Sequence, residues 1–92
     1  MYEPLDPVAA KALVRKILKE GGVGFSEHSL DEMEKDRLDE QDCVNVLRAG
    51  NVEPPDFERG TWRYRVFTPK IVVVITFRSE TSLQVVTAWR SR

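Results

Sequence analysis

The chain has 92 residues, a hydrophobic fraction of 41%, a charged fraction of 32% and a formal net charge of −1. These values are typical of one small soluble domain, assigned here to residues 1–92, and they exclude a disordered chain. No apolar run approaches the roughly 20 residues that cross a bilayer, and the N-terminal residues lack the pattern of a signal peptide, so we expect a cytoplasmic protein without a membrane segment.

Three helices are predicted in the first half of the chain. The predicted elements there are helices at residues 7–20, 28–36 and 40–50 and a short strand at residues 23–25. Asp6 and Asp39 are suited to cap the first and third helices, and either Ser26 or Ser29 can cap the second. Apolar residues recur at intervals of three or four along each helix, which gives each one a face for a core.

The second half of the chain is predicted to form a sheet. Residues 51–60 read as a loop, because two prolines and a glycine oppose regular structure. Three segments rich in β-branched and aromatic residues follow, at residues 61–67, 71–77 and 82–90, and their short connections predict antiparallel hairpins. The expected fold class is α+β, in the order α-β-α-α-β-β-β, with helices packed on an antiparallel sheet.

The segment GTWRYRV alternates large rings with arginines. With a three-residue turn at residues 68–70, Arg65 would pair with Val73, and in the next hairpin we take Arg78 to pair with Leu83. Because side chains alternate across a strand, this register places four polar residues on one face: Arg63, Arg65, Gln84 and Arg90. The apolar residues predicted beneath these polar side chains, on the same face, are Ile71, Val73, Ile75, Val86 and Ala88. The residues predicted on the other face are Trp62, Tyr64, Val66, Val85, Thr87 and Trp89.

In this register the arginines would form an anion site, from which Arg78 is separated. Arginine holds phosphate through several donors, and an apolar sheet strengthens that attraction. Residues 60–92 carry six bases and one acid, whereas residues 26–59 carry four bases and eleven acids. The alternative explanation is therefore that the arginine heads pair with helix carboxylates while their stems cover the sheet.

His28 and Cys43 are the only histidine and the only cysteine. They cannot form an internal disulfide or a Cys/His zinc site, so we expect no metal and no cofactor. Cys43 is interpreted as a core residue rather than a nucleophile. Histidine changes its charge near neutral pH, and a helix start favours its neutral form, so His28 could act as a base; a structural histidine is the alternative.

The segment from Phe25 to Gly50 resembles the entry of the domain-of-unknown-function 4258 family (DUF4258). The shared pattern is carried by Phe25, Ser26, His28, Ser29, Met33, the turn at residues 37–39, Leu47 and Gly50. The later strands are similar to one branch of that family, so the resemblance covers about residues 23–91. Many members carry arginines four and eight residues after the histidine, whereas this chain has Glu32 and Asp36, and an acidic helix is poorly suited to line an RNA groove.

The resemblance implies a toxin of a type II toxin–antitoxin pair, related in fold to RelE, BrnT and MqsR-like ribonucleases. In those folds helices cover one sheet face and RNA meets the other. The implied partner is an MqsA-type antitoxin with a zinc-binding N-terminus and a helix-turn-helix domain. The implied activity is metal-independent cleavage of mRNA, with these assignments: His28 as base or acid, Arg63, Arg65 and Arg90 stabilising phosphate, and Gln84 and Lys70 completing the RNA contacts.

Two other hypotheses are carried alongside this one. The chain could be a non-catalytic module that docks a partner protein through its basic sheet face or its acidic helices. It could also form a homodimer through the edge of the last strand, residues 82–90.

Overall fold

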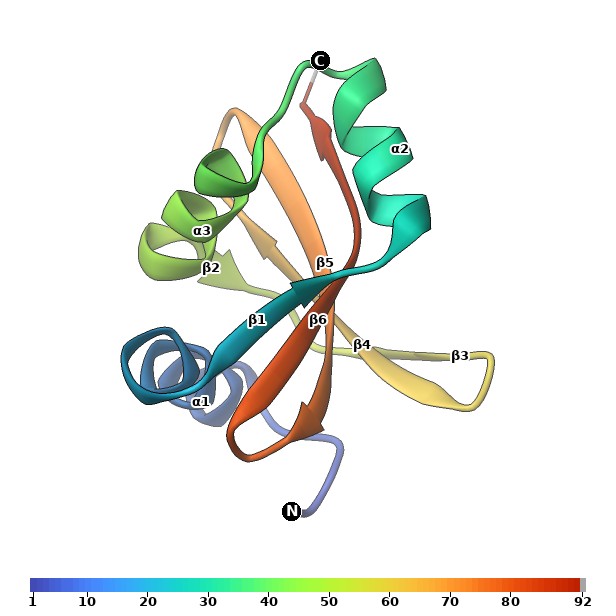
Figure 1. The fold of residues 1–92 in the computed structure, drawn as a ribbon. Helices are drawn as coiled ribbons and strands as arrows, with labels where there is room; N and C mark the ends of the chain where they lie inside the picture. The colour runs from blue at the N-terminus through green and yellow to red at the C-terminus, as the bar shows by residue number, and fades with distance from the viewer. Residues whose placement is uncertain (92) are drawn as a thin grey trace.

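The computed structural model describes residues 1–91 (Figure 1). Its elements are α1 (Pro7–Glu20), β1 (Gly22–Phe25), α2 (Glu27–Lys35), α3 (Glu40–Ala49), β2 (Asn51–Val52), β3 (Asp56–Glu58), β4 (Thr61–Phe67), β5 (Ile71–Ser79) and β6 (Ser82–Arg90). The predicted α+β class and the predicted order of elements are confirmed. The sheet is mixed, because β1 runs parallel to β6 while the remaining pairs are antiparallel.

The helices begin where the sequence places their caps. The Asp6 carboxylate accepts the N–H of Ala9 at 2.8 Å, and Asp39 and Asp42 form a reciprocal capping box. For α2 the cap is Ser26, whose hydroxyl accepts the N–H of Ser29 at 3.0 Å. Each cap satisfies N–H groups that have no partner within the first helical turn.

The strand order is β1-β6-β5-β4-β2, and β3 also pairs with β4. The prediction of a loop at residues 51–60 is wrong at β2 and β3. Pro54 and Pro55 fall between these two short edge strands, where they remove no ladder hydrogen bond. Arg59 and Gly60 both adopt positive φ, 49° and 81°, which closes the β3–β4 hairpin with the backbone twist that tight hairpins favour.

The core lies between the helices and one face of the sheet. α3 packs on β4 and β5, α1 contacts β1, β2 and β6, and α2 lies along β6 (Figure 1). The buried residues on the sheet side of this core are Tyr64, Val66, Val73, Ile75, Phe77, Leu83, Val85 and Ala88. Trp62 packs against them and forms an edge-to-face pair with Phe57 at 5.0 Å.

The register of the two hairpins differs from the predicted one by a residue. In the first hairpin Phe67 pairs with Val72 rather than with Ile71, and the N–H of Thr68 donates to the Ile71 carbonyl at 2.9 Å. Arg65 therefore pairs with Val74 rather than Val73. In the second hairpin Phe77, not Arg78, pairs with Leu83.

A bulge in β6 causes a second shift. Ile75 pairs with Val85, but Val74 pairs with Thr87, so that Val86 is the extra residue. An extra residue moves every later side chain to the other face. Four residues predicted to lie under the arginines face the helices instead: Ile71, Val73, Ile75 and Ala88.

The outer edge of β6, through which one hypothesis placed a homodimer contact, is occupied by other segments of the same chain. β1 pairs with Ser82–Val85, the hydroxyl of Ser26 donates to the Val86 carbonyl at 3.3 Å, and the Asp36 carboxylate accepts the Arg90 N–H at 2.7 Å. A covered edge does not template strand addition. Within the described part of the chain, no helix is long and apolar enough to span a bilayer.

The N-terminal segment is tied to the sheet through Tyr64. The buried Tyr64 hydroxyl donates to the Glu3 carboxylate at 2.9 Å and accepts the Leu5 N–H at 3.0 Å. Burial raises the pKa of Tyr64 from 10.0 to about 12, and Glu3 adds to this rise while the Leu5 N–H opposes it. The phenol therefore stays neutral in the folded protein at pH values where it ionises in the unfolded chain.

We expect alkaline pH to weaken the fold partly through Tyr64. Because the folded pKa is raised, the Tyr64 contribution is complete below pH 10 and is lost as the pH rises toward 12. At neutral pH, Tyr64→Phe should cost about 1 kcal/mol of unfolding free energy through the lost hydrogen bonds. Urea denaturation from pH 7 to 11 measures both effects: wild type should lose more stability than the variant, and parallel losses would contradict the role given to Tyr64.

Candidate functional site

The sheet face opposite the helices carries three arginines. One row of paired residues across β4, β5 and β6 consists of Arg65, Val74 and Thr87. A second row consists of Phe67, Val72 and Trp89. Directly paired residues share a sheet face, so these two rows lie side by side. Arg63 precedes Arg65 by two residues and joins the same face. We call this surface the arginine face, made of Arg63, Arg65, Phe67, Val72, Val74, Thr76, Arg78, Gln84, Thr87 and Trp89.

Arg78 belongs to this face, contrary to the prediction that it lies apart. Its Nη1 donates to Oε1 of Gln84 at 2.8 Å, and Gln84 pairs with Thr76 on β5. The predicted grouping of Arg63, Arg65 and Gln84 is confirmed, but their third arginine is Arg78 rather than Arg90.

Arg90 lies on the helix side of the sheet, because it pairs with Ile71 after the bulge. Its Nε donates to the Asp36 carbonyl at 2.8 Å and its Nη2 to the Arg37 carbonyl at 3.0 Å. A cation is favourable at the C-terminal end of a helix, where carbonyl groups lack partners. Arg90 therefore holds the end of α2 against β6.

Arg63 and Arg65 differ in how their guanidinium groups are held. Arg63 is 23% exposed, and its Nη1 lies 3.5 Å from a carboxylate oxygen of Glu58, while its buried Nε has no hydrogen-bond partner among the described residues. Arg65 is exposed. No hydrogen bond or ion pair of its side chain occurs within the described part of the chain, so Arg65 is the arginine of this face most available to an anion.

Lys70 lies in the turn between β4 and β5. Its N–H donates to the Thr68 hydroxyl at 3.2 Å, and its carbonyl accepts the N–H of Ser91 at 2.8 Å. The exposed side chain is at the end of the sheet that carries Phe67, so Lys70 adds a cation beside the arginine face rather than within it.

His28 is the second residue of α2 and stands apart from the arginines. Its side chain is 67% exposed, and its Nε2 lies 4.0 Å from Oε1 of Glu32, one helical turn later. The other carboxylate oxygen of Glu32 lies 3.0 Å from Nζ of Lys35. These three side chains form a polar row along α2, near the edge of β6.

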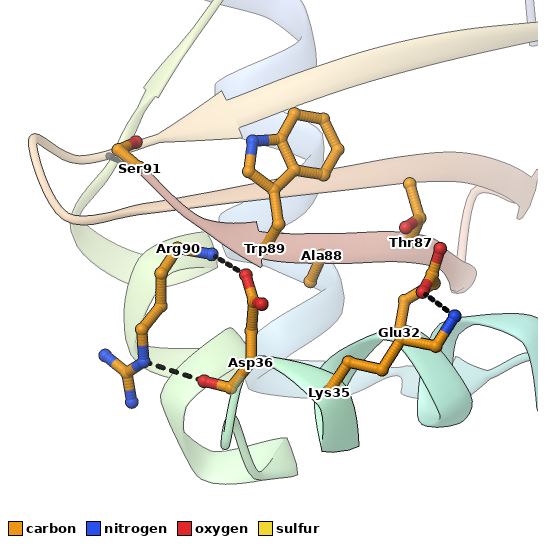
Figure 2. A pocket seen from close by; sticks show the side chains of 8 residues that line it. All are labelled: Glu32, Lys35, Asp36, Thr87, Ala88, Trp89, Arg90 and Ser91. Atoms are coloured by element: carbon orange, nitrogen blue, oxygen red, sulfur yellow. Dashed lines mark hydrogen bonds and ion pairs between the residues drawn. The ribbon is translucent and has the colours of Figure 1, made fainter.

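A groove of about 560 Å³ lies between α2 and the last residues of β6 (Figure 2). We call it the edge groove; its lining residues are Glu32, Lys35, Asp36, Thr87, Ala88, Trp89, Arg90 and Ser91. Figure 2 shows Ala88 pointing toward α2 and the Trp89 indole projecting from the opposite side of β6. Thr87 and Trp89 also belong to the arginine face, so the groove continues that face around the sheet edge.

Two other candidates for chemistry are buried. Burial, with smaller effects from nearby acids such as Asp42, raises the pKa of the Cys43 thiol from 9.0 to about 11, so the reactive thiolate is disfavoured. Tyr64 lies in the core, away from the arginines, as its position in the strand predicts. Among residues 1–91, no cluster of three or more His, Cys, Asp or Glu could hold a metal ion.

No protein-family model, no curated protein and no solved structure matches this chain. The fold and the site geometry are therefore the grounds for assigning a function.

We expect Arg90 and Arg65 to respond differently to truncation. Arg90→Ala removes two hydrogen bonds to the carbonyls of Asp36 and Arg37, just after α2, and should lower the unfolding free energy by about 1 kcal/mol. Arg65→Ala removes no such contact and should stay within about 0.5 kcal/mol of wild type. Urea denaturation at neutral pH measures both, and equal destabilisation would contradict the separation of a structural arginine from a binding arginine.

Proposed function

We propose that the arginine face binds single-stranded RNA and that the chain acts there as a metal-independent ribonuclease, the toxin of a toxin–antitoxin pair. The observation that supports this most is the exposed guanidinium of Arg65, which stands without a partner among the described residues on an apolar sheet between Arg63 and Phe67. Guanidinium groups bind phosphate strongly, and the nearby half-buried rings of Phe67 and Trp89 offer surfaces on which unpaired bases stack.

The layout places the three arginines of the arginine face and the acids of α2 in different parts of the molecule. Helices cover one sheet face, and the arginines lie on the other, which is the arrangement that the DUF4258 resemblance implies for RNA binding. The acids of α2 lie beyond β6 and need not face the phosphates held by Arg63, Arg65 and Arg78. This removes the objection that an acidic helix would line the RNA backbone.

Cleavage is assigned to His28 with the help of Glu32. The RNA 2′-oxygen would attack the adjacent phosphorus, forming a 2′,3′-cyclic phosphate and breaking the bond to the 5′-oxygen. A base takes the 2′-hydroxyl proton, and an acid gives a proton to the leaving oxygen. His28 and Glu32, 4.0 Å apart, are the pair available for these two transfers, and the arginines stabilise the phosphorane.

A non-catalytic binding module is the second candidate, and one observation favours it. His28 lies on α2, on the other side of β6 from Arg63 and Arg65, so substrate would have to bend around the strand edge to reach both. In the toxin proposal the chain works in the cytoplasm and is neutralised by an MqsA-type antitoxin. In the module proposal it binds its partner without any chemistry.

The experiment is binding and cleavage of labelled single-stranded RNA by the purified chain in the presence of EDTA. Arg65→Ala should weaken binding roughly fivefold and reduce the salt dependence by about one phosphate contact. His28→Ala should leave binding intact and slow cleavage by at least about a hundredfold. The matched control is Arg15→Ala on the helix side, where Arg15 is exposed on α1, and it should change neither quantity.

Three outcomes separate the hypotheses. Loss of affinity in Arg65→Ala together with loss of cleavage in His28→Ala supports the ribonuclease. RNA binding without cleavage by wild type contradicts the catalytic assignment and leaves RNA binding as the role of the arginine face. Equal affinities for wild type, Arg65→Ala and Arg15→Ala would show that RNA does not use the arginine face.

A further inference from the structure

One side of α3 carries a row of residues that runs from an acid to a base. Glu40, Val44 and Arg48 follow one another at intervals of four residues, so they lie on the same side of the helix. Glu40 and Arg48 are exposed, and Val44 is partly exposed and outside the core cluster. At 1.5 Å per residue, the two charged residues stand about 12 Å apart along the helix axis. We call these three residues the α3 row.

The basic end of the α3 row lies at a groove between α1 and α3. This basic groove has a volume of about 410 Å³ and is lined by Arg15, Leu18, Lys19 and Arg48. Within the described part of the chain, Arg15 and Lys19 make no side-chain hydrogen bond or ion pair, and Arg48 makes one contact, from Nη1 to Oδ1 of Asn45 at 3.5 Å. The three cations therefore keep their capacity to bind carboxylates.

The acidic end of the α3 row lies at a hollow between α2 and the start of α3. The volume of this acidic hollow is about 450 Å³, and its charged lining is three acids and one base: Glu34, Asp39, Glu40 and Arg37. Leu30, which is 41% exposed, adds an apolar side chain. Asp39 caps α3, whereas Glu34 and Glu40 make no side-chain hydrogen bond or ion pair among the described residues. The hollow therefore offers free carboxylates to a basic surface.

The charge pattern of the α3 row is self-complementary. A two-fold axis through Val44 would set the rows of two copies antiparallel, with Glu40 of each copy facing Arg48 of the other and the two Val44 side chains in contact. Interfaces between identical subunits related by a two-fold axis need such a surface, on which residue i meets residue j and j meets i. Because Arg48 lines the basic groove and Glu40 lines the acidic hollow, the same axis brings each groove to the hollow of the second copy.

The helix dipole does not account for the whole pattern. It favours an acid at the start of α3 and a base at its end, which suits Glu40 and Arg48 individually. It does not explain why Arg15, from the middle of α1, lines the same groove as Arg48 without a carboxylate among the lining residues. Like charges gathered in this way repel one another, and an acidic surface from a second copy would relieve that repulsion.

We propose that the α3 row is an interface between two copies of this chain, related by a two-fold axis through Val44. The occupant of each basic groove is the acidic hollow of the second copy, and charge attraction at both ends flanks an apolar contact at the centre. The arginine face lies on the opposite side of the sheet from α3, so both copies keep it open. The proposal therefore goes beyond the proposed function and does not depend on RNA binding.

The test is sedimentation velocity of the intact chain over a wide range of protein concentrations, at low and at high salt. Salt screens attraction between exposed charges, with a Debye length of about 10 Å at 0.1 M and about 3 Å at 1 M. Wild type should form dimers at low salt. Its dissociation constant should rise at least about tenfold between these two salt concentrations, because the contact depends on charge pairs at both ends of the row.

Charge reversal assigns the association to the α3 row. Arg48→Glu sets two carboxylates against each other at both ends of the interface, and Glu40→Arg sets two guanidinium groups there. Each variant alone should weaken dimerisation at least about tenfold. An equimolar mixture of the two variants should form heterodimers, because every charge then faces its opposite. Val44→Lys, which places two ammonium groups at the axis, should also dissociate the dimer.

The matched control is Lys16→Glu. Lys16 is exposed on α1 and lies outside the basic groove, and its replacement changes the net charge by the same amount as Arg48→Glu. This variant should dimerise as wild type does.

A chain that sediments as a monomer at every concentration would overturn the proposal. Dimerisation of Arg48→Glu or Val44→Lys as strong as that of wild type would show that another surface is used. Growth into oligomers larger than dimers would contradict a closed two-fold interface. Failure of the mixed variants to associate, when each has the far-ultraviolet circular dichroism of wild type, would contradict the pairing of Glu40 with Arg48.

Discussion

The pairing of β5 with both of its neighbours is the constraint on which the rest of the structure depends. Its alternate side chains fill the core under the helices, and the intervening ones, such as Val72 and Val74, form the floor of the arginine face. A shift of one residue in the β4–β5 hairpin would place Arg65 in the core and Val66 in water. The burial of Tyr64, Val73 and Ile75 therefore fixes which arginines meet on the open face.

The fold uses its arginines in two distinct ways. Arg90 has a structural role, because its hydrogen bonds to the carbonyls of residues 36 and 37 hold the end of α2 against β6. The Arg65 side chain makes no hydrogen bond or ion pair within the described chain, so its guanidinium remains available to an anion. The acids of α2 are likewise divided: Asp36 covers the strand edge at Arg90, while Glu32 faces the edge groove. The type of a residue and its position in the sequence do not reveal these differences, because they depend on which groups each side chain contacts in the folded chain.

The sequence predicted the helices well, because Asp6, Ser26 and Asp39 mark their starts by capping chemistry that acts over three residues. It also predicted that Arg63, Arg65 and Gln84 share a face. It failed for Arg78 and Arg90, because the one-residue shifts in hairpin register and the bulge at Val86 are fixed by packing across the whole sheet. Nothing in the local sequence marks that bulge. The edge groove was missed for the same reason, since it joins α2 to a strand more than fifty residues later.

The most direct test of the central claim is nuclear magnetic resonance mapping of single-stranded RNA on the isotope-labelled chain. The account predicts that RNA shifts the backbone amide signals of Arg65, Val74 and Thr87 and the Trp89 indole signal most strongly. Signals from exposed α1 and α3, including Arg15 and Arg48, should hardly move. Shifts concentrated on those helices, or no shifts at any RNA concentration, would contradict an RNA site on the arginine face.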